Sequence, residues 1–212
     1  DEIDYITIAS TGNAQDFGNL GTATAEIRGC SSSTRGLFAG GQTPSQSNTI
    51  EYVEIPTLGN ASDFGDLSNS LHATGGLSSP TRGIFGGGHP GYLKHIDFVI
   101  ISSKGNAVHF GETTKGRRAA TGGGNSVRGI FVGGYLGNAD QLNTMDYVTL
   151  ASEGNAIDFG ENLFTGSYSG ATSNGNRMVI AGGYNAPSTR TNSISYVTIA
   201  TRGNAQDFGD MS

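Results

Sequence analysis

The feature that most constrains this chain is an internal repeat. Five segments share one pattern: an alternating stretch of aliphatic and polar residues, a Gly-Asn step, and a phenylalanine followed by glycine. They are 3–18, 50–65, 96–111, 145–160 and 194–209, and their phenylalanines recur at intervals of 46 to 49 residues. One such unit cannot bury its apolar face alone, so the pattern predicts units that stack around a shared core.

A second recurring segment lies between the copies of the first. It begins with arginine, which glycine follows in three of the four copies, and it ends in Gly-Gly. The four copies span 35–41, 82–88, 128–134 and 177–183. Together the two segments predict four strands in each unit. In the third unit these are strand A at 118–123, strand B at 128–134, strand C at 145–150 and strand D around 156–159. Strand C alternates at the strand period of two and no window shows helical periodicity, so we expect an all-β protein with almost no helix.

Glycine accounts for 35 of the 212 residues, more than twice the usual share of about 7%. The glycines stand at fixed positions between runs rich in Ile, Val, Tyr and Phe, which predicts short strands and tight turns. The Gly-Asn step suits a hairpin turn, because both residues tolerate positive φ and asparagine can cap its own turn. The small residues of strand A would fit where sheets crowd together near the axis of a ring.

Charge and residue types argue against several classes of function. A formal net charge of −6 disfavours nucleic acid as a partner, because such binding needs a basic face. No run of about 18 apolar residues is present, so we expect no membrane insertion. Cys30 is the only cysteine and the four histidines lack paired spacing, so we expect no metal site. No nucleophile elbow, triad or phosphate loop is visible, and we expect no catalytic residues, no cofactor and no enzymatic activity.

The repeat resembles the kelch repeat of β-propellers, which has a period near 50. The resemblance rests on strand B ending in Gly40-Gly41, Gly87-Gly88, Gly133-Gly134 and Gly182-Gly183, with Tyr135 and Tyr184 following two of these pairs. Kelch units usually carry tryptophan on the last strand, and this chain has none. That place is taken by Phe17, Phe64, Phe110, Phe159 and Phe208. The chain is therefore kelch-like, and its Gly-Asn-Ala-x-Asp-Phe-Gly motif also resembles repeats of structural and fibre proteins of marine bacteriophages.

The kelch resemblance implies one β-propeller domain over 1–212, made of four-stranded antiparallel blades. Its units would be 1–20 (partial), 21–67, 68–113, 114–162 and 163–212. Because there are five C–D strand pairs and four A–B pairs, the N-terminal pair is left over. Three interpretations stay open: part of a larger, five-bladed ring, which we favour; a four-bladed ring with an extra hairpin; or a neighbouring chain that pairs with the spare strands. A native mass well above 21.8 kDa would support the first.

Arginine opens strand B in every complete unit, at Arg35, Arg82, Arg128 and Arg177. We expect these side chains to join neighbouring units through a carboxylate or a carbonyl, and an anion-binding ring of arginines is the alternative. Candidate carboxylate partners on strand C are Asp4, Glu51, Asp97 and Asp146. The strand D aspartates are expected to accept hydrogen bonds from backbone N–H groups of the C–D turn; they are Asp16, Asp63, Asp158 and Asp207.

The loops after the Gly-Gly pairs are where the units differ. They span 42–49, 89–95, 135–144 and 184–193, and they vary in length and chemistry while the adjacent strands repeat. In a propeller these B–C loops share one face with the D–A loops. Exposed tyrosine beside amides and carboxylates suits recognition of sugars or polar protein surfaces. The candidate binding residues are His89, Tyr92, Lys94, Tyr135, Asn138, Asp140, Gln141, Tyr184, Asn185 and Arg190.

Repeat, loop variation and low charge together favour a non-enzymatic binding or structural module on a virion or another extracellular assembly. Its partner would be a host-surface glycan or protein, or other virion proteins. The alternative is a cytoplasmic kelch-type scaffold that docks a protein partner. The unpaired terminal strands also allow a homo-oligomer.

Overall fold

The computed structural model describes residues 1–137, 140–185 and 189–212, and within these ranges the chain forms strands and turns without any helix. Sixteen of the strands make four four-stranded antiparallel sheets, which confirms the expected all-β fold. Sheet I contains β3 (Arg28–Ser31), β4 (Arg35–Ala39), β5 (Thr49–Glu54) and β6 (Ser62–Asp66). Sheet II contains β7 (Gly75–Ser78), β8 (Arg82–Gly86), β9 (His95–Ile100) and β10 (Val108–Glu112).

The same order of strands A to D continues in the second half of the chain. Sheet III contains β11 (Thr121–Gly124), β12 (Arg128–Val132), β15 (Thr144–Thr149) and β16 (Ile157–Glu161). Sheet IV contains β17 (Gly170–Ser173), β18 (Arg177–Ala181), β21 (Ser193–Thr198) and β22 (Gln206–Asp210). The leftover C–D pair forms a separate N-terminal hairpin of β1 (Glu2–Tyr5) and β2 (Gln15–Asn19). No helix in the described ranges could cross a membrane.

Two details differ from the sequence prediction. Strand A of sheet III begins at Thr121 and not at 118, because Ala119 has a φ of 54°, which a strand cannot accommodate. Two of the B–C loops carry short hairpins of their own. These are β13 (Tyr135–Gly137) with β14 (Asp140–Gln141), and β19 (Tyr184–Asn185) with β20 (Thr189–Arg190).

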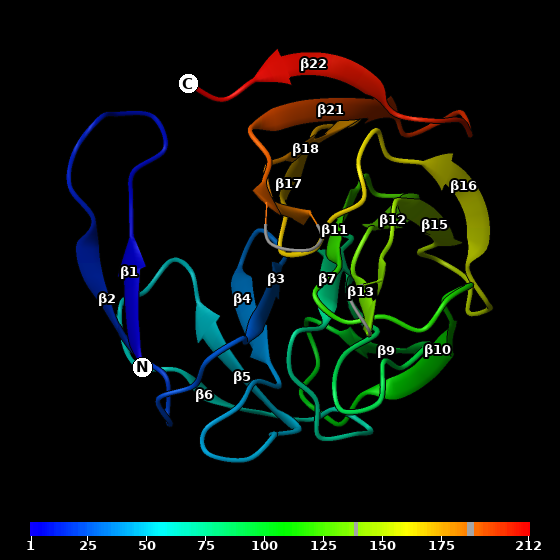
Figure 1. The fold of residues 1–212 in the computed structure, drawn as a ribbon. Coiled ribbons are helices and arrows are strands. Elements are labelled where there is room, and N and C mark those ends of the chain that lie inside the picture. Colours follow the sequence, from blue (N-terminus) through cyan, green and yellow to red (C-terminus); the bar gives the residue numbers. More distant parts are fainter. Residues whose placement is uncertain (138–139, 186–188) are drawn as a thin grey trace.

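The sheets are arranged around their first strands (Figure 1). β3, β7, β11 and β17 lie side by side in that order at the inside, and β6, β10, β16 and β22 lie at the outside. Small residues are needed on the inner strands, as expected. A Cβ atom on Gly122 of β11 would lie 2.5 Å from the carbonyl oxygen of Gly76 on β7, so only glycine permits this approach.

The core lies between successive sheets. Phe110 at the end of sheet II packs in one buried cluster with Ile84, Phe131 and Val148, which come from sheets II and III. Each strand D phenylalanine also meets the strand C aromatic ring of its own hairpin edge to face, with centroids 5.8–6.1 Å apart. Four of the five phenylalanines are 2–8% exposed, whereas Phe208 is 57% exposed. The repeat position is thus buried wherever a following sheet covers it.

The Gly-Asn step joins neighbouring sheets, which differs from the expected self-capped turn. Between sheets II and III, Gly154 N donates to Phe110 O (2.8 Å) and Ala156 N donates to Glu112 O (2.8 Å). The Asn155 side-chain oxygen accepts from Glu112 N at 3.1 Å. Equivalent side-chain bonds are made by Asn60, Asn106 and Asn204 to the preceding strand D. The asparagine side chain therefore accepts a backbone hydrogen bond from strand D of the preceding sheet, a contact that the sequence alone could not indicate.

Replacing Gly111 by alanine should destabilise the protein more than the same change at Gly209. Both residues follow the repeated phenylalanine and have positive φ, 156° and 133°, so each substitution carries a backbone strain of about 1–3 kcal/mol. A Cβ on Gly111 would also lie 2.2 Å from Gly154 O, whereas nothing lies within 4 Å of one on Gly209. The clash should add about 1–3 kcal/mol for Gly111 alone. Urea unfolding of both variants measures the difference, and equal losses would contradict the inter-sheet contact.

Three of the four strand B arginines link neighbouring sheets, and their partners are backbone carbonyls, one of the two expected kinds, and not the predicted strand C acids. Arg35 Nη1 donates to Ile101 O (3.0 Å), Arg82 Nη1 to Leu150 O (3.1 Å) and Arg128 Nη1 to Ile199 O (2.9 Å). Each guanidinium also lies over the strand C ring of its own sheet, at 4.5–4.9 Å from the centroid. Carboxylate contacts are present for Arg35 with Glu54 and for Arg82 with Glu153, both outside the predicted set.

Three of the four predicted strand C acids, Glu51, Asp97 and Asp146, instead hold the connection that leads into their own sheet. Glu51 Oε1 accepts from Gly21 N at 2.8 Å, and Asp97 Oδ2 accepts from Ser68 N at 3.0 Å. The buried Asp146 accepts from Thr114 Oγ1 and from Arg117. These carboxylates therefore bond to the chain that enters their sheet and not to an arginine of strand B.

The strand D aspartates do not share the expected turn role. Asp207 Oδ1 accepts from Gly209 N at 3.3 Å, and Asp158 lies 3.9 Å from Arg202. All four of these side chains are exposed, which agrees with a surface position for Asp16, Asp63, Asp158 and Asp207.

Candidate functional site

One position in each unit brings the chain before strand A against the chain after the Gly-Gly pair. At this position isolated antiparallel bridges join Ala25 to Gln42, His72 to His89, Arg118 to Tyr135 and Ser167 to Tyr184. The backbone geometry repeats while the side chains change from unit to unit. Such a constant scaffold with variable side chains is suited to recognition.

The bridges of sheets II and III bring several rings together, and we call His72, His89, Tyr92, Tyr135 and Arg118 the aromatic cluster. The ring centroids of His72 and His89 are 4.9 Å apart, those of His89 and Tyr92 5.8 Å, and those of Tyr92 and Tyr135 5.7 Å. The Arg118 guanidinium carbon lies 5.1 Å from the Tyr135 centroid and 5.8 Å from that of Tyr92. Loops of two sheets thus form one continuous surface of rings and a cation.

Several polar atoms of this cluster are buried without a hydrogen-bond partner in the described protein. They are Nδ1 of His72, Nδ1 of His89 and Nε of Arg118, and the adjacent Gln141 has an unpartnered Oε1. Buried polar atoms in folded proteins nearly always find a partner, so these groups have unused hydrogen-bonding capacity that a buried water would satisfy. His72 is only 5% exposed. Burial lowers its pKa, which the carboxylate of Glu26 partly offsets, so this imidazole is neutral at neutral pH.

The cluster borders the inner strands, where four equivalent residues have left-handed backbones. Glu26, Ala73, Ala119 and Tyr168 have φ between 53° and 56°, and their backbones are bonded in series. Tyr168 N donates to Ala119 O, Ala119 N to Ala73 O, and Ala73 N to Glu26 O. This conformation is strained for residues other than glycine. It recurs because each such residue passes a hydrogen bond from one sheet to the next.

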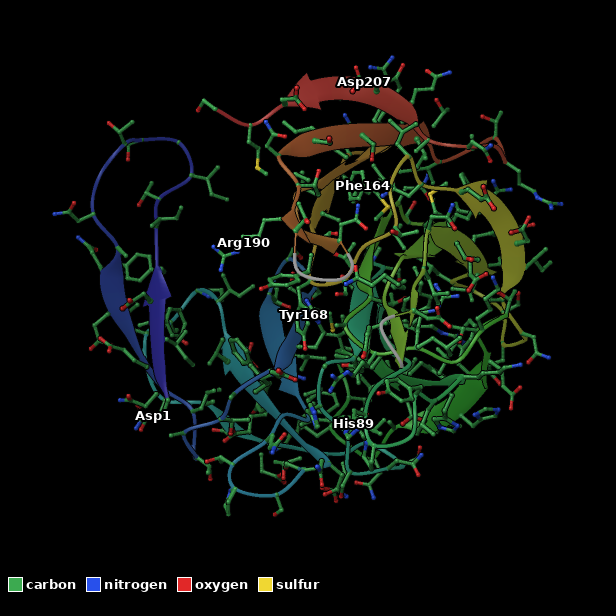
Figure 2. The ribbon with its side chains drawn as sticks, viewed as in Figure 1. Asp1, His89, Phe164, Tyr168, Arg190 and Asp207 are labelled. Atoms are coloured by element: carbon green, nitrogen blue, oxygen red, sulfur yellow. The ribbon has the colours of Figure 1, made fainter. Side chains whose placement is uncertain are left out.

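Side chains from the segments that precede the first strands of sheets I and IV meet beside His72. The Tyr168 hydroxyl donates to Glu26 Oε1 at 3.3 Å, and Glu26 Oε2 lies 3.5 Å from His72 Nε2. Figure 2 shows Tyr168 at the inside of the sheets and His89 at the loops. Burial and the nearby Glu26 carboxylate raise the pKa of Tyr168, so its hydroxyl stays protonated and donates.

The structure divides the predicted binding residues into separate groups. His89, Tyr92, Tyr135 and the neighbouring Gln141 belong to or border the aromatic cluster. Tyr184, Asn185 and Arg190 form a second group on the β19–β20 hairpin, with Arg190 5.9 Å from the Tyr184 centroid. Lys94 and Asp140 are exposed, and Asp140 lies on the β13–β14 hairpin that also carries Tyr135 and Gln141. Asn138 lies outside the described residues.

Three members of the site were missed from the sequence: His72, Arg118 and Glu26. A signal for the first two was present, because they occupy the position ten residues before the strand B arginine, where the units carry Ala25, His72, Arg118 and Ser167. In the prediction, variation among units at a fixed repeat position pointed to binding residues only in the loops after the Gly-Gly pairs. That these residues face those loops became visible only with the bridges in place.

A serine, a histidine and an aspartate also meet in sheet II, but without the geometry of a hydrolase triad. Ser68 Oγ lies 2.7 Å from His95 Nε2, and Asp97 Oδ1 lies 2.8 Å from the same nitrogen. Ser68 also donates directly to Asp97. In a triad the serine and the aspartate use opposite ring nitrogens, so that the histidine can pass a proton between them. The arrangement here holds the chain that enters sheet II.

Across the described ranges, no three His, Cys, Asp or Glu side chains gather in a way that could hold a metal ion. Comparison of the chain with protein-family models and with curated proteins finds no match.

Proposed function

We propose that this chain is a kelch-like β-propeller, or most of one, that serves as a non-enzymatic binding module of a virion or another extracellular assembly. Four four-stranded sheets set around their A strands support the propeller, and the inter-sheet phenylalanines fill the place of the kelch tryptophan. The ligand we propose is a glycan, bound at the aromatic cluster.

The observation that carries this proposal is the continuous row of rings from His72 to Tyr135 with Arg118 beside it. Aromatic faces stack on the apolar faces of sugar rings, while imidazole, guanidinium and amide groups bond to hydroxyls. His89, Tyr92 and Tyr135 are each partly exposed, so the rings are accessible from solvent. The unpartnered nitrogen atoms of His72, His89 and Arg118 are buried, so they do not contact a ligand that stacks on the exposed rings.

Replacing Tyr135 by alanine should weaken glycan binding at least tenfold, since a central aromatic residue of a binding site commonly contributes 1–2 kcal/mol or more. The glycan is first identified on an array of cell-surface polysaccharides with the native protein, and its affinity is then measured by titration calorimetry. Tyr184→Ala is the matched control. Tyr184 holds the same repeat position on sheet IV but lies outside the aromatic cluster, so its loss should leave binding within about twofold.

Two outcomes would contradict the glycan proposal. One is a silent array with folded protein; the other is binding that depends on Tyr184 and not on Tyr135. A silent array together with capture of a protein partner that is lost in Tyr135→Ala would favour the protein-docking scaffold at the same surface.

A further inference from the structure

The array of sheets ends on two unmatched edges. In Figure 1 the N-terminal hairpin faces sheet IV across a gap, and we call the space between them the open position. Each junction between sheets I to IV repeats one set of contacts. The residues equivalent to those that form these inter-sheet contacts are present on both sides of the open position, but they do not contact one another.

Apolar residues on the two edges are complementary by repeat position. At the junction of sheets III and IV, Phe159 packs with Met178 of strand B, Val197 of strand C, Ile199 just after that strand, and Ala205. Phe208 is the equivalent of Phe159 and is 57% exposed. The equivalents of the last three covering residues lie on the N-terminal hairpin as Ile6, Ile8 and Ala14. Ile6 is 64% and Ile8 96% exposed, while Val197 and Ile199 are 3% and 0% exposed.

Hydrogen-bonding groups show the same complementarity. At the junction of sheets III and IV, Gly203 N donates to Phe159 O, Ala205 N to Glu161 O, and Glu161 N to the Asn204 side chain. The corresponding donors and acceptors at the open position are Gly12, Asn13 and Ala14 on one side and Phe208 and Asp210 on the other. In the part of the chain that the structure describes, none of these bonds is made. Arg177, the last strand B arginine, likewise has no carbonyl of a following sheet.

One element is still missing between the edges, because β1 has no strand B beside it. In the complete sheets strand C pairs with strand B, as β9 does with β8. All four A–B pairs of the chain already belong to sheets I to IV. The described residues of a second folded copy therefore have no free A–B pair to offer.

We infer that the open position binds a β-hairpin with the A–B chemistry of the repeat. Its first strand would consist of small residues, and its second would begin with Arg-Gly followed by two apolar residues. Pairing with β1 would complete a fifth sheet with the N-terminal hairpin, bury Ile6, Ile8 and Phe208, and give Arg177 the carbonyl of Ile8. The inference rests on the ring architecture of the proposed function and is independent of the ligand.

The test supplies such a hairpin from the chain's own sequence. Ser212 has the repeat position of Ser68, so a copy of residues 69–88 is appended after Ser212. Hydrogen exchange of the amides in β1 and β22 is then compared with that of the native chain. We expect exchange at these strands to slow at least tenfold and the thermal midpoint to rise by several degrees. The control graft is identical except that aspartate replaces the residues copied from Ile84 and Phe85, which should abolish both effects.

Two results would overturn the inference. The first is exchange at β1 and β22 that is the same in the native chain and in both grafts. The second is a native chain whose β1 and β22 amides are already protected in an oligomer, because the edges would then be covered by another copy. Neither result bears on the glycan proposal, since the graft leaves Tyr135 and its neighbours untouched.

Discussion

Phe110→Ala is expected to lower the free energy of unfolding by about 3–5 kcal/mol, as large-to-small substitutions of buried phenylalanine do. The Phe110 side chain is 2% exposed and packs with residues of sheets II and III, including Phe131 and Val148. Its loss removes apolar burial and leaves a cavity at the junction, where both sheets are held by their hydrogen bonds and cannot close the space. Urea unfolding followed by far-ultraviolet circular dichroism measures the change.

Phe208→Ala is the control for this prediction. Phe208 has the same sequence motif, the same strand D position and the same edge-to-face contact with a tyrosine, here Tyr196 at 6.0 Å. It is 57% exposed because no sheet follows it, and we expect a loss below about 1 kcal/mol, as for most surface changes. Equal losses for the two variants would show that stacking of sheets is not what stabilises the repeat phenylalanines.

Asp146→Ala is expected to cost about 3–5 kcal/mol, because it leaves a buried guanidinium without its carboxylate. Asp146 and Arg117 are each 0% exposed, and Arg117 Nη2 donates to Asp146 Oδ2. Arg117 also donates to Gly133 O at 3.0 Å and to Thr144 O at 3.2 Å. Burial lowers the pKa of Arg117, an effect that the Asp146 carboxylate opposes. Equilibrium unfolding at neutral pH gives the loss.

Ser195→Ala is the matched control for Asp146→Ala. Ser195 holds the same strand C position in sheet IV and is equally buried, but its hydroxyl makes a neutral bond to Asn162 at 2.6 Å. Losing this bond should cost about 1–3 kcal/mol, because a buried amide oxygen is left without its donor. A loss at Asp146 no larger than that at Ser195 would argue against a dominant role for the buried ion pair.

The strands could be predicted because their signals are local. The arginine that begins strand B was placed correctly in all four sheets, and β15 lies within one residue of the predicted strand C. Alternation at a period of two and glycine at fixed turns act over a few residues, so they survive without tertiary context. The strand A boundary was missed because the left-handed backbone of Ala119 depends on a hydrogen bond to Ala73 of the neighbouring sheet.

The candidate site could be predicted only in part. His89, Tyr92 and Tyr135 were found because they follow the Gly-Gly pairs, where variation among units is visible. Their partners His72 and Arg118 were not found, since they come from a different part of the unit. Lys94 and Asp140 were predicted from the same loops, and both side chains are exposed.

By itself, the sequence determined an all-β chain of repeated four-stranded units and the order of the strands within each unit, because backbone preferences and side-chain alternation are set by near neighbours. Only the tertiary structure decided what the repeated residues contact. Phe110 and Phe208 share one motif yet differ in burial, and Asn155 bonds to the preceding sheet and not to its own turn. The physical reason is that these energies come from surfaces far apart in sequence, which meet only when one sheet packs against the next.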